Sequence, residues 1–164
     1  MIARYLTKSF YINLFILFLV YMLDRVSKMY VIYLDAQNIG TDIFESTYLN
    51  IKLIWNKGIA FGLFSFDKIY FYNLLSAIIA FVIVILFVMS LKSVGFKRYS
   101  LFMIIGGALG NLYDRIFFSA VPDFIDFHVG DFHWFIFNVS DIFITLGVMS
   151  MIILEFINSD DKIS

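Results

Sequence analysis

The stretch FYINLFILFLVYMLDRVSKMYVIY, residues 10–33, decides the class of this chain. It is mostly apolar and longer than the roughly 20 residues that a helix needs to cross about 30 Å of hydrocarbon. It also runs past the short apolar core of a secretory signal, contains Asp24, Arg25 and Lys28, and has no small-x-small cleavage site. We therefore predict that this stretch is an uncleaved membrane-spanning helix.

Three further stretches have the same apolar character, at about Ile69–Leu91, Leu101–Phe118 and Phe135–Ile157. The 164 residues are 62% hydrophobic and only 15% charged, whereas soluble domains are about 45–50% apolar and about 25% charged. The sequence thus predicts an α-helical polytopic membrane protein with four transmembrane helices. We expect residues 1–164 to form a single integral membrane domain.

Net charge and cysteine content exclude several classes of function. The net charge is −1, which gives no indication of a nucleic-acid partner, and we expect none. There is no cysteine, which excludes disulfides, thiolate zinc sites and a cysteine nucleophile.

Basic residues flank the predicted spans unevenly. Arg4 and Lys8 precede the first span, and Lys92, Lys97 and Arg98 lie between the second and the third. The positive-inside rule places these segments, and with them both termini, in the cytoplasm. The segment at about residues 34–68 and the connection at residues 119–134 then lie on the outer side.

The outer segment contains one strand pattern. Apolar and polar side chains alternate from Tyr48 to Trp55, and the run ends at the turn sequence Asn56-Lys57-Gly58. Alternation with a period of two, bounded by turn residues, predicts a β-strand with one apolar face. We expect this strand to rest on the bilayer surface, with Trp55 and Trp134 in the interfacial aromatic belt.

Polar side chains inside the spans are the most informative feature, because a charge at the bilayer centre costs at least about 2.5–3.5 kcal/mol. At a rise of 1.5 Å per residue, Asp24 and Arg115 each lie about 21 Å from the cytoplasmic start of their helices, and Asp141 lies about 10 Å inward from Trp134. Three helices thereby bring polar residues to one depth in the outer third of the membrane. These residues are Asp24, Lys28, Asn111, Asp114, Arg115, Asn138 and Asp141.

Some of these groups fit a structural role as well as a chemical one. Asp24 and Lys28 are i,i+4 neighbours on one helix face, and Asp114 adjoins Arg115, so both pairs suit buried ion pairs that hold helices together. The small residues of Gly106–Gly110 are more typical of close helix packing than of catalysis.

Asp123 and Asp141 fit a purely structural role least well. Asp141 has no basic residue within one helical turn. Asp123 follows Pro122, the only proline, and we expect it on a stiffened turn where the chain leaves the third helix. Two carboxyls without an evident cationic partner at a membrane boundary suggest chemistry in which they share a proton.

The two histidines superficially resemble metal ligands. His128 and His133 lie close in sequence to Asp126 and Asp131. Their spacing matches no recognised ligand pattern. We therefore expect solvated residues of an exposed loop and no metal site.

Five blocks of sequence carry a resemblance to one family. They are DRVSK at Asp24–Lys28, NKGIAF at Asn56–Phe61, GGALGNLYDR at Gly106–Arg115, VPDFID at Val121–Asp126 and FNVSD at Phe137–Asp141. In this order, on a four-span frame with a long first outer segment, they resemble the bacterial lipoprotein signal peptidase (signal peptidase II) family along nearly the whole chain.

The resemblance implies an aspartic endopeptidase of the bacterial cytoplasmic (inner) membrane, which removes the signal peptide from prolipoproteins that carry diacylglycerol on a cysteine. It implies that Asp123 and Asp141 form a catalytic dyad and that the outer segment forms a small extracytoplasmic β-sheet cradle. It further implies a set of residues that bind substrate or support the dyad, namely Asp24, Lys28, Asn56, Asn111, Asp114, Arg115 and Asn138. We expect no cofactor, partners limited to prolipoprotein signal peptides and membrane lipids, and a monomer.

The chain departs from the family pattern at four positions. The family usually has Gln at Arg25, Val at Pro122, and Ala at both Ile59 and Ser140. Ser140 adjoins Asp141, and its hydroxyl has two potential partners, the Asp141 carboxylate or a helix carbonyl.

Two other classes of function remain as alternatives. A proton- or ion-coupled transporter also uses carboxyls in the membrane, but usually near the midplane, at broken helices within internal repeats. This chain has four continuous apolar spans and no repeat. A non-catalytic membrane scaffold offers no reason to gather so many acids at one depth.

Overall fold

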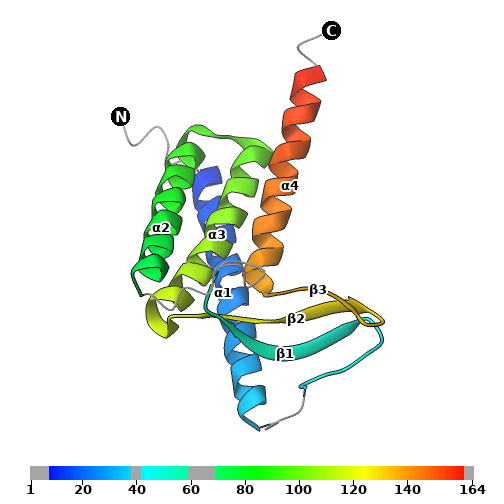
Figure 1. Cartoon of the computed structure of the whole chain (residues 1–164). Coiled ribbons are helices and arrows are strands. Elements are labelled where there is room, and N and C mark those ends of the chain that lie inside the picture. Colours follow the sequence, from blue (N-terminus) through cyan, green and yellow to red (C-terminus); the bar gives the residue numbers. More distant parts are fainter. Residues whose placement is uncertain (1–7, 38–41, 59–68, 161–164) are drawn as a thin grey trace.

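The structure, a computed structural model, describes residues 8–37, 42–58 and 69–160. Its elements, in chain order, are α1 (Lys8–Gln37), β1 (Leu49–Asn56), α2 (Ile69–Lys92), α3 (Gly95–Phe118), β2 (Val121–Val129), β3 (Phe132–Phe137) and α4 (Val139–Asp160). The helices form a bundle with the sheet toward one end, and the start of α1 and the end of α4 lie toward the other (Figure 1). All four helices are long and apolar enough to cross a membrane, so the predicted four-helix fold with a small sheet is confirmed.

The third and fourth helices begin at other residues than the sequence indicated. α3 begins at Gly95 rather than at Leu101, because the polar residues before the apolar stretch are already helical. α4 begins at Val139 rather than at Phe135, because Phe132–Phe137 pairs with β2 as a strand. Asp141 therefore lies in the first turn of α4 and not well inside a helix.

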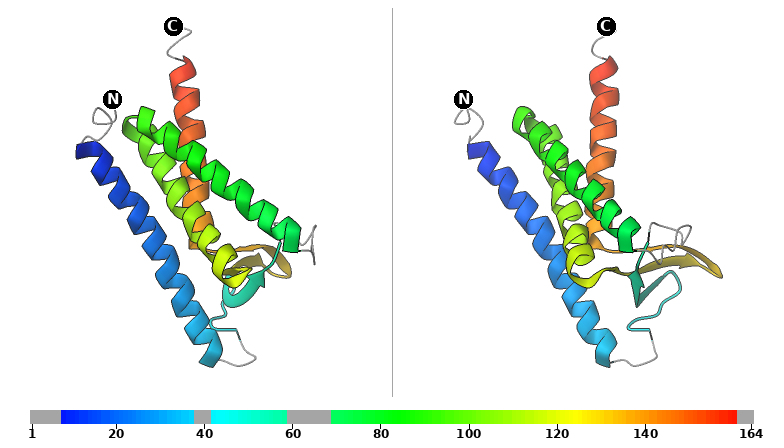
Figure 2. Two further views of the ribbon diagram at one scale, coloured as in Figure 1. Left: turned by 90° about the vertical axis from the view of Figure 1, so that its left-hand side faces the viewer. Right: turned by 60° about the vertical axis from the view of Figure 1, so that its left-hand side comes forward.

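α3 is the central helix of the bundle and contacts α1, α2 and α4, as the two views of Figure 2 show. Its glycines permit this arrangement. A Cβ added at Gly106 would lie 2.9 Å from the Leu17 carbonyl oxygen of α1, and one at Gly107 would lie 2.7 Å from the Ser140 carbonyl oxygen of α4. Side chains at these positions would push the helices apart, so the predicted packing role of the glycine run is confirmed.

The outward faces of the helices are apolar. Phe15 of α1, Phe81 of α2 and Phe156 of α4 are among many large side chains that are mostly exposed. Buried polar residues are instead concentrated where α1, α3 and α4 meet. This inverted distribution suits a protein surrounded by hydrocarbon, with polar groups gathered at an interior site.

The sheet has the strand order β1-β2-β3, and both neighbouring pairs are antiparallel. β1 is the strand predicted between Tyr48 and Trp55, although a register shift between Ile51 and Ile54 interrupts its simple alternation. Because β1 is separated from β2 by two helices in the sequence, the sheet ties the outer segment to the connection between α3 and α4.

Asp123 does not lie on a turn, as the sequence suggested, but in β2 opposite Ile54 of β1. The turn that ends α3 is made by Ser119, whose φ of 53° is left-handed. Pro122 is tolerated in β2 because it lies near the start of the strand, before β3 begins to pair at Ile125.

Candidate active site

Asn138 contacts both candidate catalytic acids. Its side-chain Nδ2 donates to Asp123 Oδ1 at 2.6 Å, and its backbone N–H donates to Asp141 Oδ2 at 3.1 Å. Asp123 comes from β2, Asp141 comes from the first turn of α4, and Asn138 lies at the junction of β3 with α4. The sheet therefore brings together two acids that the sequence places on separate elements.

Asn138 and Asp141 also cap the start of α4. The Asp141 backbone N–H donates to Asn138 Oδ1 at 3.2 Å, while the Asn138 N–H donates to the Asp141 carboxylate. This reciprocal pair has the geometry of a capping box, which satisfies donors that the first turn leaves free. Asp141 therefore has a structural role beside its candidate chemical one, and its position is fixed by the helix that carries it.

Asp123 has an unusual acidity for an aspartate. Its side chain is buried, and this burial raises the pKa of the carboxyl to about 6. Donation from Asn56 Nδ2, 2.9 Å from Asp123 Oδ2, and from Asn138 acts in the opposite direction, whereas the nearby Asp141 carboxyl raises the pKa further. A carboxyl with this pKa exchanges its proton close to neutral pH, as a general acid or base requires.

Four buried charged side chains lie beside the two acids, namely Asp24, Arg25, Lys28 and Asp114, which we call the charge cluster. Lys28 Nζ lies 2.9 Å from Asp24 Oδ1 and 2.7 Å from Asp114 Oδ2. Arg25 contacts the same two acids, at 2.9 Å from Asp24 Oδ2 and 2.6 Å from Asp114 Oδ1. Two cations thus balance two anions, which offsets the cost of placing them inside the bundle.

The charge cluster is connected to Asp141 through two hydrogen-bonded links. Lys28 Nζ donates to Asn111 Oδ1 at 2.8 Å, and Asn111 Nδ2 donates to Asp141 Oδ1 at 2.9 Å. In addition, the Ser140 backbone N–H donates to Asp24 Oδ1 at 3.0 Å. The charges on α1 and α3 therefore fix both the side chain of Asn111 and the first turn of α4.

Gly110 of α3 is needed where these groups meet. A Cβ added there would clash with the Asp24 carboxylate and would lie 2.5 Å from Ser140 Oγ. Within the described residues, Ser140 Oγ is buried without a hydrogen-bond partner, so neither partner expected for this hydroxyl is found.

The structure brings together all but one of the residues that the sequence assigned to substrate or dyad support. Asn56, Asn111 and Asn138 contact the two acids directly, and Asp24, Lys28 and Asp114 belong to the charge cluster. Arg115 instead faces α2, with its Cζ 5.5 Å from the centroid of the Tyr72 ring. The Ile59–Phe61 part of the second sequence block lies outside the described residues.

Arg25 is the residue of this site that sequence reasoning missed. No role in the site is predicted for it from the sequence, yet it pairs with Asp24 and Asp114. Its i,i+3 spacing from Lys28 was the available signal, because residues so spaced share a helix face.

The expectation of an exposed loop around the histidines is wrong for most of its residues. Asp126 and His128 lie in β2 and His133 lies in β3, because the two strands pair as far as Val129 and Phe132; Asp131 occupies the turn between them. Asp126 is fully buried. Although burial favours the neutral acid, hydrogen bonds with Lys52 and His133 hold the pKa of Asp126 below its ordinary value.

These features define a helical membrane protein that holds two carboxyls at the junction of a span with a small sheet. Residues 16–157 match the family described as signal peptidase (SPase) II, and the chain therefore belongs to this family. The lipoprotein signal peptidase of Pelagibacter ubique (strain HTCC1062) is 48% identical over 155 residues, which cover 94% of this chain and 93% of that protein. The lipoprotein signal peptidase of Anaplasma phagocytophilum (strain HZ) is 44% identical over 147 residues, or 88% and 91% of the two chains.

The fold is also similar to that of solved bacterial membrane enzymes. One, determined by the in meso method at 2.3 Å resolution, has a TM-score of 0.72 and 31% sequence identity, and the match covers 92% of this chain and 90% of that chain. A second, at 1.9 Å resolution, has a TM-score of 0.66 and 32% identity. The likeness therefore extends over helices and sheet together.

Proposed function

We propose that this chain is an aspartic endopeptidase that removes the signal peptide from diacylglyceryl-modified prolipoproteins at the outer face of the bacterial cytoplasmic membrane. Membership of the signal peptidase II family and the two lipoprotein signal peptidases at 44–48% identity support the reaction and the substrate class. The aspartic mechanism rests on one observation, that Asn138 donates to both Asp123 and Asp141.

The chemistry follows from two carboxyls that share one site. Because two neighbouring carboxyls do not both ionise easily, they hold one proton between them. The ionised carboxylate takes a proton from a water molecule, whose oxygen attacks the scissile carbonyl carbon. The protonated carboxyl donates to the carbonyl oxygen, and a proton then passes to the departing amine. The proton belongs to the pair rather than to Asp123 or Asp141 alone.

The surrounding groups suit this chemistry. Asn56 and Asn111 each donate to one acid, Asp123 and Asp141 respectively, so both carboxyls are oriented by amides that do not titrate. Lys28 holds Asn111 from the other side. The apolar outer surfaces of the helices let a substrate's lipid and signal peptide approach from within the bilayer.

A transporter is a poorer explanation of the same residues. Its substrate sites usually lie near the midplane, at broken helices. Here α1, α3 and α4 are continuous helices, and the two candidate acids lie where α4 meets the sheet. A scaffold would need the charge cluster for packing, but it would not need Asp123, which contacts two asparagines rather than a cation.

The proposed function is tested by cleavage of a synthetic prolipoprotein segment by the purified chain in detergent. We expect cleavage before a cysteine that carries diacylglycerol, and little or none of the matched peptide with an unmodified cysteine. A metal chelator is expected to leave the rate unchanged, because the proposed steps use only carboxyls and water. Equal cleavage of both peptides, or cleavage of neither, would contradict the assignment.

We predict that both termini face the cytoplasm, because Arg4, Lys8, Lys92, Lys97 and Arg98 flank the same end of the predicted spans. A reporter fused to the C-terminus should be found on the cytoplasmic side of the membrane. The same reporter inserted after Glu45 should be found on the outer side. A C-terminal reporter found outside the cytoplasm would contradict the proposed orientation.

Replacing Asn56 by Ala should change the pH dependence of cleavage. Asn56 donates to the ionised form of Asp123, so its loss should raise the pKa of Asp123 above about 6. Whichever form of Asp123 is active, the corresponding limb of the plot of kcat/KM against pH should move to higher pH.

Asn50→Ala is the matched control for this prediction, since Asn50 lies on the same strand and contacts Ser46 instead. The control should keep the wild-type pH profile. If the limb of the pH profile stays in place or moves to lower pH in Asn56→Ala, the ionisation of Asp123 does not determine that limb.

A further inference from the structure

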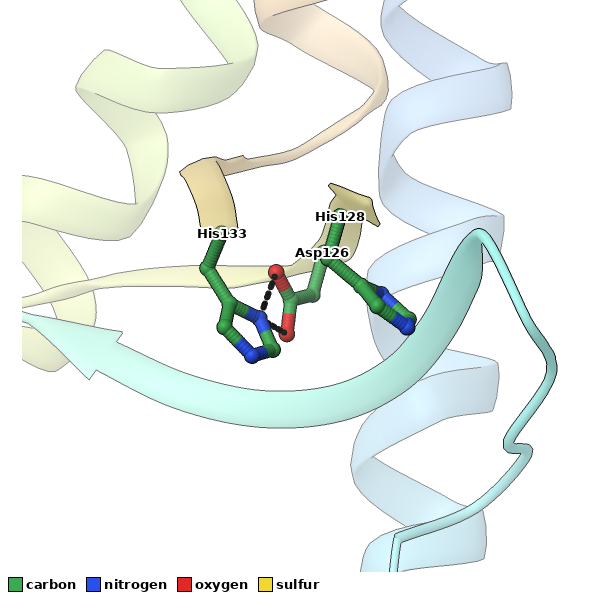
Figure 3. Close-up of side chains that lie close together, drawn as sticks. All are labelled: Asp126, His128 and His133. Atoms are coloured by element: carbon green, nitrogen blue, oxygen red, sulfur yellow. Dashed lines mark hydrogen bonds and ion pairs between the residues drawn. The ribbon is translucent and has the colours of Figure 1, made fainter. Parts of the chain in front are cut away.

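We propose that Asp126, His128 and His133, the hairpin cluster, form a binding site for a divalent transition-metal ion, with Zn²⁺ as its probe. Each residue offers one ligand atom, and the three atoms lie within 4.8 Å of one another. Figure 3 shows the Asp126 carboxylate in contact with the His133 ring, with the His128 ring close by. Two imidazole nitrogens and one carboxylate oxygen are a donor set that suits Zn²⁺ and related ions. The site is separate from the two candidate catalytic acids and goes beyond the proposed function.

The backbone of the β2–β3 hairpin fixes the two histidines relative to each other. His128 is the pairing partner of His133 across the two strands. Their rings stack with centroids 5.0 Å apart and an angle of 22° between their planes. An ion held by both rings would therefore link two strands whose backbones are already in register.

The Nδ1 atom of His128 supports the proposal independently. Among the described residues this atom is shielded from solvent and has no hydrogen-bond partner. A buried polar atom without a partner is destabilising. Coordination through its lone pair would give this nitrogen the partner that the rest of the described chain does not supply.

His133 and Asp126 are already in contact, with His133 Nδ1 at 3.1 Å from Oδ1 and 3.0 Å from Oδ2 of the carboxylate. Ligand atoms that each lie about 2.0–2.1 Å from a Zn²⁺ ion are at most about 4 Å apart. The cluster must therefore contract on binding. The side chain of His133 is 46% exposed, which leaves it room to turn.

Lys52 of β1 is the competitor for this site. Its Nζ lies 2.6 Å from Asp126 Oδ2, so a cation already occupies one side of the carboxylate. A bound metal ion would have to displace or tolerate this ammonium group. Removing the charge of Lys52 should therefore tighten metal binding, an effect with the opposite sign to that of removing a ligand.

The experiment uses the full chain, purified in detergent and freed of metal with a chelator that is then removed. Zn²⁺ is titrated in competition with a chromophoric chelator at about pH 7.5, because metal ligands bind in their deprotonated forms. We expect one saturable site per chain with Kd at or below about 10 μM, and a rise in Tm on binding because the ion ties β2 to β3. His128→Ala and His133→Ala should each weaken binding at least about tenfold.

Two further variants separate specific binding from adsorption to the surface. Asp131→Ala removes the exposed acid of the hairpin turn and should bind Zn²⁺ as the wild type does. Lys52→Met should bind it more tightly. His133→Gln, which keeps a polar side chain of similar size, replaces His133→Ala if that variant does not fold. The proposal is overturned if no saturable binding occurs, if the histidine variants bind like the wild type, or if Lys52→Met does not bind more tightly.

Discussion

Replacing either Asp123 or Asp141 by Asn is expected to lower the cleavage rate at least about 10³-fold, with little change in the amount of protein in the membrane. Asn has the size of Asp and keeps an acceptor oxygen, but it neither ionises nor shares a proton. Asn at position 141 can still accept from the Asn138 backbone N–H, so the cap of α4 should persist. Asn at position 123 can still accept from Asn56 or Asn138.

The rate is measured with a saturating lipid-modified substrate, and folding is followed by Tm in the same detergent. Asp131→Asn is the matched control, since it neutralises an exposed acid of the same outer region. It should cleave at the wild-type rate. Loss of protein from the membrane in the Asp123 or Asp141 variants, in place of loss of activity, would favour a structural role for these acids.

The second large effect is expected from Lys28→Met, which should destabilise the protein by about 3–5 kcal/mol. Lys28 is fully buried and contacts both Asp24 and Asp114. Met has a similar length but no charge, so Arg25 alone would remain to balance two buried carboxylates. The variant should also cleave poorly, because Asn111 loses the donor that orients it toward Asp141.

Stability is measured from the midpoint of unfolding in mixed micelles. Lys92→Met, at the exposed end of α2, is the control and should unfold like the wild type. The double variant Lys28→Met/Asp114→Asn restores the balance of charge between Asp24 and Arg25, and we expect it to regain at least about half of the lost stability. A double variant that is less stable than Lys28→Met would show that charge balance is not what Lys28 provides.

The four spans and β1 could be predicted from the sequence because their signals are local. A helix that crosses the membrane needs about 20 apolar residues in a row, and residues 10–33 provide them. The alternation from Tyr48 to Trp55 likewise belongs to the strand itself.

The β2–β3 hairpin could not be predicted so easily, because a short apolar run does not distinguish a strand from a helix. Phe135–Phe137 lies only a few residues before the apolar stretch of α4, and the predicted fourth span therefore includes it. Only its pairing with β2 makes it a strand, and that pairing depends on residues elsewhere in the chain. The pairing of β2 with β1, which also depends on distant residues, likewise places Asp123 in a strand and not on the predicted turn.

The candidate site was predictable in its members but not in its connections. Depth along three helices indicated that Asp24, Asn111 and Asp141 would meet, and hydrogen-bonded links connect them. Depth does not say which cation balances which acid. Asp114 adjoins Arg115 in sequence, yet it pairs with Arg25 and Lys28, because the helix face that carries Asp114 is turned toward α1.

The central claim is that Asp123 and Asp141 act as one catalytic unit, and the rate of the double variant Asp123→Asn/Asp141→Asn tests it most directly. Single-turnover cleavage of the lipid-modified substrate is compared among the wild type, both single variants and the double variant, all at equal folded concentration. Because members of a unit do not contribute additively, the double variant should be within about threefold of the slower single variant. Losses that multiply, or either single variant cleaving at near the wild-type rate, would contradict the claim.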